Sequence, residues 1–228
     1  MPQIEFKEVT KEYEPGFKAL DDVSFSVASG EYLFIVGASG AGKSTVVRLL
    51  VREEQPSAGE IWFDDENILM FEGTQISDLR RSIGVVFQDF KLLESKNVFE
   101  NVAIALEVVN ASDFEIRNIV PNVLSMVSLS DKMFKYPRQL SGGEKQKLSI
   151  ARALAHEPDV LVADEPTGMI DPDSADEILE ILDKINSLGT TIIMATHNAE
   201  VVDKMKKRVI RLDRGQIVSD KKGGKYRG

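Results

Sequence analysis

The chain has 228 residues, of which 43% are hydrophobic and 29% are charged, a balance typical of a globular domain with a sizeable core. It contains no cysteine, which excludes disulfides and thiolate metal sites, and no apolar run approaches the roughly 20 residues of a membrane helix. The net charge of −9 argues against nucleic-acid binding, and the beginning, MPQIEFKEV, lacks the basic and apolar regions of a signal peptide.

Basic residues are concentrated towards the end of the chain. Ten Lys or Arg and only two acidic residues fall between Lys204 and Gly228. Such a segment suits the surface of an anionic membrane, but charge runs are usually solvated tails, and we favour the second interpretation.

Strand patterns dominate the first part of the chain. Residues 4–9 and 23–27 alternate apolar and polar side chains, as half-buried strands do. Tyr32–Val36 is a continuous apolar run before a glycine, which is typical of a buried parallel strand. A helix is expected from Lys43 to about Glu53, and further strands over 59–63 and 83–87.

Helical patterns replace strands over residues 89–139, where apolar side chains recur at helical spacing in 98–109 and 114–127. We predict an inserted helical subdomain here, within one domain of residues 1–228. Later strands are expected at 160–163 and 191–195, helices at 174–188 and 199–205, and a hairpin over 209–220 with its turn at Asp213–Gly215. Alternating strands and helices indicate the α/β class, with a mainly parallel sheet.

A glycine-rich segment, GASGAGKST, lies between a predicted strand and a predicted helix and fits the pattern G-x-x-x-x-G-K-[ST]. Its glycines allow backbone N–H groups to approach phosphate oxygens, and the helix start adds further N–H groups and a positive dipole end. Lys43 offers a charge to the β- and γ-phosphates, and Ser44 offers a hydroxyl to Mg²⁺. The predicted nucleotide-binding residues are Gly37, Ala38, Ser39, Gly40, Ala41, Gly42, Lys43, Ser44 and Thr45.

Two adjacent carboxylates, Asp164 and Glu165, end the predicted strand VLVAD. Asp164 is suited to hold Mg²⁺ and Glu165 to polarise an attacking water as a general base. By itself such a pair more often caps a helix, but the phosphate-binding pattern favours the catalytic interpretation. His197 follows another strand, where it either reaches the γ-phosphate or caps the next helix.

The segment Leu140–Glu144, LSGGE, resembles the signature motif of ATP-binding cassette (ABC) ATPases. The order of GASGAGKST, Gln88, LSGGEKQ, VADEPT, Asp171 and His197 is similar to that family over nearly the whole chain. The resemblance implies a P-loop triphosphatase with a mainly parallel sheet core, an N-terminal antiparallel β subdomain and an inserted α-helical subdomain. It also implies hydrolysis of ATP with Mg²⁺ as cofactor.

The resemblance also implies roles for single residues. Tyr13 would stack on adenine, Gln88 would ligate Mg²⁺ and contact the attacking water, and His197 would be the switch histidine. The signature would cap the γ-phosphate of ATP held by a second copy, so that two ATP molecules lie in a head-to-tail homodimer. The residues predicted to contact this shared ATP are Ser141, Gly142, Gly143 and Glu144, together with Asp171, which lies in a loop that crosses the dimer interface.

Some stretches, among them IGVVFQDFKLL and NVAIALEV, are similar to the cell-division branch of these ATPases. That branch implies a cytoplasmic protein held at the inner face of the bacterial membrane by an FtsX-like integral membrane partner. Alternatives are a subunit of a lipoprotein-releasing or macrolide-type exporter, and a non-hydrolysing ATP switch. Phe90, Leu92 and Leu93 either form part of a docking groove for the partner or pack inside the helical insert; both interpretations stay open.

Overall fold

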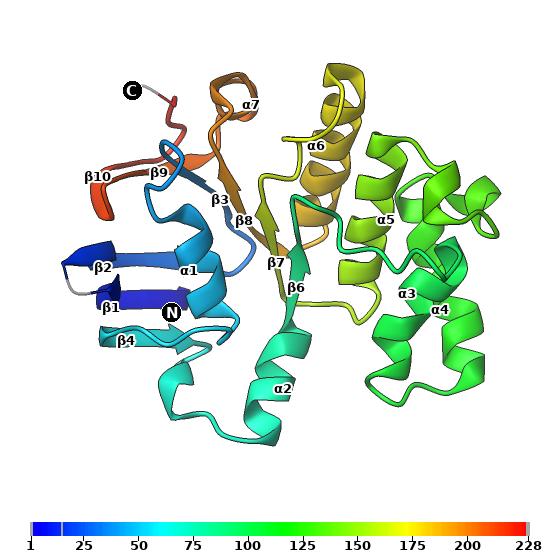
Figure 1. Cartoon of the computed structure of the whole chain (residues 1–228), viewed down its shortest axis with the longest axis horizontal. Helices are drawn as coiled ribbons and strands as arrows, with labels where there is room; N and C mark the ends of the chain where they lie inside the picture. Colours follow the sequence, from blue (N-terminus) through cyan, green and yellow to red (C-terminus); the bar gives the residue numbers. More distant parts are fainter. Residues whose placement is uncertain (1, 15, 227–228) are drawn as a thin grey trace.

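The computed structural model describes residues 2–14 and 16–226, which form two sheets flanked by helices (Figure 1). The strands are β1 (Pro2–Glu14), β2 (Phe17–Ala28), β3 (Tyr32–Val36), β4 (Ala58–Phe63), β5 (Glu66–Asn67), β6 (Ile83–Val86), β7 (Val160–Asp164), β8 (Thr191–Thr196), β9 (Arg208–Asp213) and β10 (Gln216–Lys221). The α-helices are α1 (Lys43–Leu50), α2 (Thr74–Ser82), α3 (Val98–Glu107), α4 (Asp113–Met126), α5 (Gly142–Leu154), α6 (Pro172–Ser187) and α7 (Ala199–Met205).

The larger sheet has the strand order β10-β9-β3-β8-β7-β6. Its strands run parallel from β9 to β6, and β10 pairs antiparallel with β9 at one edge. Every residue of β3 and β8 is buried, because helices or the second sheet cover both faces. The predicted mainly parallel sheet is therefore confirmed.

The smaller sheet has the order β2-β1-β4-β5, and all of its pairs are antiparallel. It forms the left part of the molecule in Figure 1, beside α1. This sheet accounts for the half-buried pattern of the first strands, since one face packs on the core and the other meets solvent.

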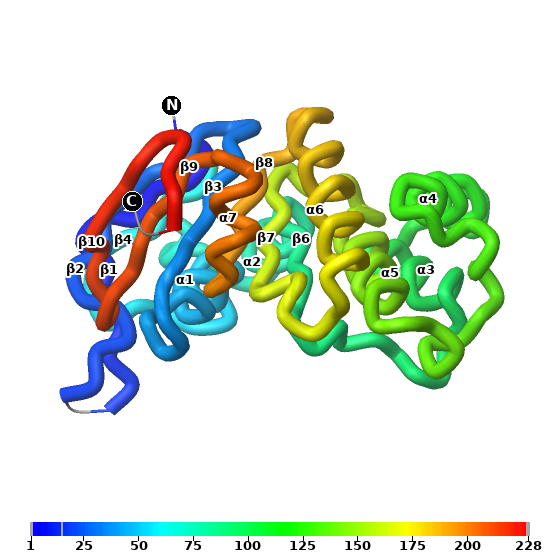
Figure 2. The backbone as a smooth tube through the Cα atoms, turned by 90° about the horizontal axis from the view of Figure 1, so that it is seen from above, coloured from blue at the N-terminus to red at the C-terminus, as the bar shows by residue number. Residues whose placement is uncertain are grey.

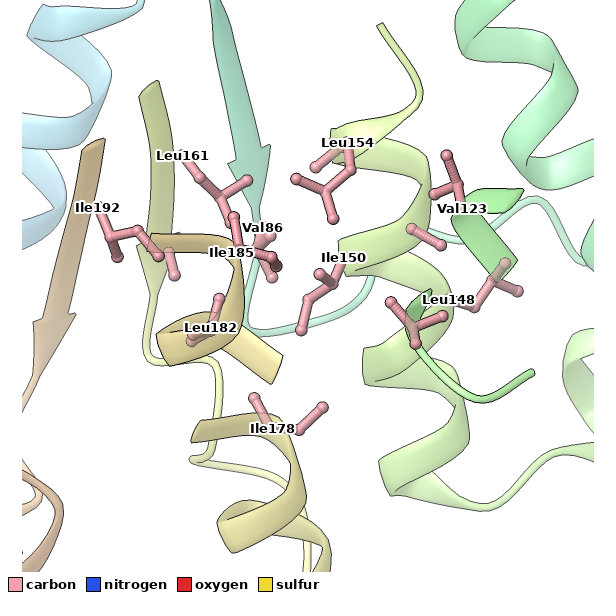
Figure 3. Close-up of a cluster of buried hydrophobic side chains, with 14 of the residues drawn as sticks. Val86, Val123, Leu148, Ile150, Leu154, Leu161, Ile178, Leu182, Ile185 and Ile192 are labelled. Atoms are coloured by element: carbon pink, nitrogen blue, oxygen red, sulfur yellow. The ribbon is translucent and has the colours of Figure 1, made fainter. Parts of the chain in front are cut away.

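Two hydrophobic clusters fill the two sides of the larger sheet. Successive strand residues point to opposite faces, so Leu33 and Ile35 enter one cluster and Phe34 enters the other. The first cluster includes α1 and the antiparallel sheet, and the second includes α3 to α7. Figure 3 shows side chains of α5 and α6 that pack with Leu161 and Ile192 in the second cluster. Helices α1 and α5 are thus on opposite faces of the sheet.

Helices α3, α4 and α5 pack against one another, and α3 and α4 lie at one end of the molecule in Figure 2. Within the described residues, no helix has the length and apolar character that crossing a bilayer demands.

Three local features differ from the sequence-based expectations. Helix α1 ends at Leu50 rather than near Glu53, because the chain turns into a left-handed conformation at Arg52 (φ 53°). Strand β6 ends at Val86, so Gln88 lies beyond the strand end. Helix α2 was not expected, since Leu79 is its one buried residue and it has too few apolar positions to give a periodic pattern.

Candidate functional site

The loop between β3 and α1 holds a conformation that requires glycine. Gly42 has φ 107°, and a Cβ placed on it would lie 2.5 Å from the carbonyl oxygen of Ala19. No side chain of the described residues caps the start of α1. The first N–H groups of this helix are therefore available to an anion.

Lys43 is almost fully buried, and its ammonium group is held by the same loop. Its Nζ donates hydrogen bonds to the carbonyl oxygens of Gly37 (2.9 Å) and Ala38 (3.2 Å) and lies 3.6 Å from Glu165 Oε1. These contacts offset the cost of burying a charge and fix the ammonium among the glycines of the loop.

Glu165 follows β7 and is held by residues at the end of the neighbouring strand β8. Its Oε1 lies 2.7 Å from His197 Nδ1, and its Oε2 accepts hydrogen bonds from Thr196 Oγ1 (3.1 Å) and from the His197 backbone N–H (3.3 Å). The ends of β3, β7 and β8 thus bring Lys43, Glu165 and His197 together, as expected at the carboxyl edge of a parallel sheet.

Asp164 has the features of a cation ligand. Burial raises the pKa of its carboxyl group, while the Ser44 hydroxyl beside it acts in the opposite direction. Its buried Oδ1 has no hydrogen-bond partner in residues 2–14 and 16–226. An oxygen left unpaired beside a hydroxyl suits Mg²⁺, which prefers a few protein oxygens together with phosphates and water. Among these described residues, no group of three or more His, Asp or Glu side chains is arranged to hold a metal ion by itself.

Lys43, Ser44, Glu165 and His197 border a cavity of about 430 Å³, and Asp164 lies behind them, outside its lining. The residues that line it are Tyr13, Phe17, Ala19, Ser39, Gly40, Gly42, Lys43, Ser44, Thr45, Arg48, Gln88, Glu165 and His197. Gln88 reaches the cavity from beyond β6, and its amide nitrogen lies close to Gly168, in the loop after Glu165.

Sequence reasoning missed Phe17, Ala19, Arg48 and Thr196. Phe17 is 58% exposed, and in the pairing of β1 with β2 it lies next to the strand end that carries Tyr13. Both aromatic rings border the cavity and could contact a base. The available signal in the sequence was a large aromatic residue directly after the Pro-Gly pair of EYEPGFK.

The signature residues lie apart from this cavity. Ser141 caps α5: its Oγ accepts from Glu144 N (3.2 Å), and Glu144 Oε2 accepts from Ser141 N (2.8 Å). Within the described part of the chain, none of Ser141, Gly142, Gly143 and Glu144 lines the cavity, because α5 belongs to the opposite face of the sheet.

Asp171 belongs to the same second group. It caps α6, where its carboxylate accepts hydrogen bonds from Ser174 N (2.9 Å) and Ser174 Oγ (2.7 Å), and these bonds lower its pKa. A Cβ placed on Gly143 would lie 2.4 Å from Ser174 Oγ, so the starts of α5 and α6 pack directly together. The predicted site residues therefore form two separate groups in one copy of the chain.

Comparison with known proteins identifies this arrangement. The sequence model of the family described as ABC transporter matches residues 20–168. The chain belongs to the ABC transporter family. The cassette MJ0796, solved as a dimer in a post-hydrolysis state bound to ADP and Pi, is 33% identical, with a TM-score of 0.88 over 97% of this chain and 99% of that one. The chain is thus an ABC ATPase, and the predicted fold and ATP hydrolase activity are confirmed.

Curated relatives narrow the branch of the ABC family. The cell division ATP-binding protein FtsE of Bacillus subtilis is 49% identical over 223 residues, covering 98% of both chains. FtsE of Streptococcus pneumoniae is 46% identical over 226 residues, covering 99% of this chain and 98% of that protein. The resemblance to the cell-division branch is therefore confirmed.

Proposed function

We propose that this ABC ATPase hydrolyses ATP at two shared sites in a head-to-tail homodimer and drives a separate membrane protein during cell division. The observation that carries the proposal is the division of the site residues into two groups. The phosphate loop, Glu165 and His197 border one cavity, whereas Ser141 and Asp171 lie at helix starts on the other face of the sheet. A second copy, rotated by a twofold axis, would bring its signature to the cavity of the first.

Nucleotide binding follows from the contacts of the phosphate loop. The β- and γ-phosphates would replace the carbonyl oxygens that now accept hydrogen bonds from Lys43 Nζ. The uncapped start of α1 would donate backbone N–H groups to the same anion, and Tyr13 and Phe17 would contact the base. Asp164, Ser44 and Gln88 would hold Mg²⁺, which neutralises charge on the phosphates when it is bound.

Hydrolysis would use Glu165 as the general base. Its Oε1, which lies 2.7 Å from His197 Nδ1, would exchange that partner for the attacking water and accept its proton. Thr196 Oγ1 and the His197 N–H hold Oε2, so the carboxylate keeps its orientation while Oε1 changes partner. Gln88, whose amide nitrogen lies near Gly168 in the loop after Glu165, would orient the water.

A test of the shared site combines Ser141→Arg with Glu165→Gln. The second substitution removes the general base, so bound ATP should not be hydrolysed. The arginine would fill the space for the γ-phosphate, so the variant should bind ATP as a monomer and fail to dimerise in ATP and Mg²⁺. Light scattering after size exclusion measures the mass, and equilibrium dialysis measures bound ATP.

The matched control is Ser112→Arg, because Ser112 and Glu115 form the same capping pair at the start of α4, away from the cavity. It should lose a similar cap, worth about 1 kcal/mol, and still dimerise. Dimerisation of the Ser141→Arg variant in ATP and Mg²⁺ to the same extent as the control would refute the shared site.

The membrane partner is proposed from the FtsE relatives, and we infer an integral protein of the FtsX type at the inner face of the cell membrane. Leu92 packs against the core and Leu93 is 38% exposed, so Leu93 is the better candidate for contact with the partner. A photocrosslinker at Leu93 should capture an FtsX-like protein in membranes. Capture of a lipoprotein-releasing or macrolide-exporting subunit instead would favour that alternative.

A further inference from the structure

The loop that carries Gln88 into the cavity has an unfavourable backbone conformation. Phe90 (φ 58°) and Lys91 (φ 49°) are consecutive left-handed residues, and neither is a glycine. L-residues with side chains of this size rarely adopt that region, so the surrounding structure must hold the loop in place.

Arg152 supplies much of that hold from the last turn of α5. Its guanidinium donates hydrogen bonds to the carbonyl oxygens of Lys91 (2.6 Å) and Phe90 (2.9 Å), the same two residues that have positive φ. The planar fork of arginine can reach two adjacent carbonyl oxygens at once, whereas lysine has a single nitrogen. The contact is specific to backbone atoms and does not depend on the side chains of the loop.

A second clamp holds the other end of the loop. Asn101 of α3 is fully buried; its Oδ1 accepts from Leu93 N (2.9 Å), and its Nδ2 donates to the carbonyl oxygens of Leu93 (3.1 Å) and Lys96 (2.9 Å). With this end fixed on α3, the position of Gln88 depends on β6 before it and on the Arg152 contact after it.

We propose that Arg152 is a positioning residue that fixes Gln88 at the nucleotide cavity and joins it to α5, the helix that Ser141 caps. The inference rests on the proposed function for the role of Gln88 in hydrolysis. Helix α5 runs from Gly142 to Leu154 without a break, and at 1.5 Å per residue it spans roughly 20 Å. A displacement at the signature end would therefore move the carbonyl oxygens that Arg152 holds in the Gln88 loop.

The test compares Arg152→Met, Arg152→Lys and the control Arg117→Met. Arg117 is exposed on α4, so its replacement makes the same chemical change away from the loop. Hydrogen exchange of residues 89–93 in the full chain without nucleotide should be about tenfold faster in Arg152→Met, intermediate in Arg152→Lys and unchanged in Arg117→Met.

Steady-state kinetics then separate positioning from folding. In Arg152→Met, kcat should fall about ten- to a hundredfold while the KM for ATP changes less than about twofold, because the phosphate loop is untouched. Arg152→Lys should recover part of kcat. If loss of Arg152 only damaged the fold, the fraction of active protein would fall equally in Arg152→Met and Arg152→Lys, and Arg152→Lys would recover no kcat.

The outcomes are distinct. Unchanged exchange in residues 89–93 of Arg152→Met would refute the contact in solution. Faster exchange with unchanged kcat would refute the positioning of Gln88. If the wild-type chain turned over no ATP, the proposed function would fail, and the exchange experiment would still decide whether Arg152 holds the loop.

Discussion

The starts of α1 and α5 are both glycine-rich, yet the structure prepares them differently. At α1 the N-cap is Gly42, with φ 107° and no side-chain cap among the described residues, and a buried lysine lies beside the free N–H groups. At α5 the N-cap is Ser141, which is exposed and exchanges hydrogen bonds with Glu144. The start of α1 leaves its donors open, whereas at α5 the capping pair satisfies the N–H groups of Ser141 and Glu144.

Under the proposed function, this difference explains how one chain can contribute half of each shared site. An open, lysine-bearing helix start can bind a triphosphate alone, because its donors have no competing acceptor side chain. The capped and exposed N-terminus of α5 is stable without a ligand, and it is accessible to ATP bound by a second copy. Under the proposed function, the first binds ATP and the second reports its presence across the dimer.

The largest expected effect comes from Glu165→Gln. In this variant the α1 start of one copy and the α5 start of the other would stay bound to the same unhydrolysed ATP. Loss of the base should lower kcat about a hundred- to ten-thousandfold and produce an ATP-dependent dimer. Phosphate release and light scattering measure the two effects. The control Glu157→Gln changes an exposed carboxylate that is not among the residues lining the cavity and should leave both unchanged. Full turnover in Glu165→Gln would exclude Glu165 as the base.

Lys43→Ala should weaken ATP binding at the start of α1 and leave the start of α5 unchanged. It removes the charge that faces the phosphates and should weaken ATP binding about ten- to a hundredfold. Isothermal titration of the monomeric chain with ATP gives the dissociation constant, with Lys225→Ala as a control at an exposed lysine. Equal affinities in the two variants would count against the assignment of the phosphate loop.

The open start of α1 depends on glycine, which Gly42→Ala and Gly40→Ala test together. Both positions have positive φ, but a Cβ has free space at Gly40 and would lie 2.5 Å from Ala19 O at Gly42. We expect a loss of about 1 kcal/mol in the free energy of unfolding for Gly40→Ala and more than about 2 kcal/mol for Gly42→Ala. Urea denaturation measures both, and equal losses would show that the loop relaxes around the methyl group.

The smallest expected effect concerns the capped start of α5. Hydrogen bonding to the Ser141 N–H, and then the Lys132 ammonium, lower the pKa of Glu144 below its ordinary value of 4.5. A lowered pKa means that the charged form stabilises the fold above pH 4.5 and that this contribution is lost as the pH falls through the lowered value. The stability difference between wild type and Glu144→Gln should therefore shrink between pH 7 and pH 3. A constant difference in urea midpoints would refute the role of the charge.

The sequence predicted the elements that have strong local patterns. Tyr32–Val36 had to be a buried strand because its five apolar residues serve both faces, and GASGAGKST had to be a phosphate loop because of its flanking elements. Helix α2 and Phe17 escaped prediction, since one buried residue gives no periodicity and an aromatic side chain does not show what it faces. No local pattern marks Arg152, because its partners lie about sixty positions earlier in the chain.

By itself, then, the sequence determined the α/β class, the family and the residue types available for ATP chemistry, because these depend on local periodicity and on motifs of a few residues. Only the tertiary structure decided which of those residues meet. Alternation along β3 places α1 and α5 in clusters on opposite faces of the sheet, so Glu165 and His197 join Lys43 while Ser141 and Asp171 do not. That separation arises from packing between distant segments, which no short stretch of sequence contains.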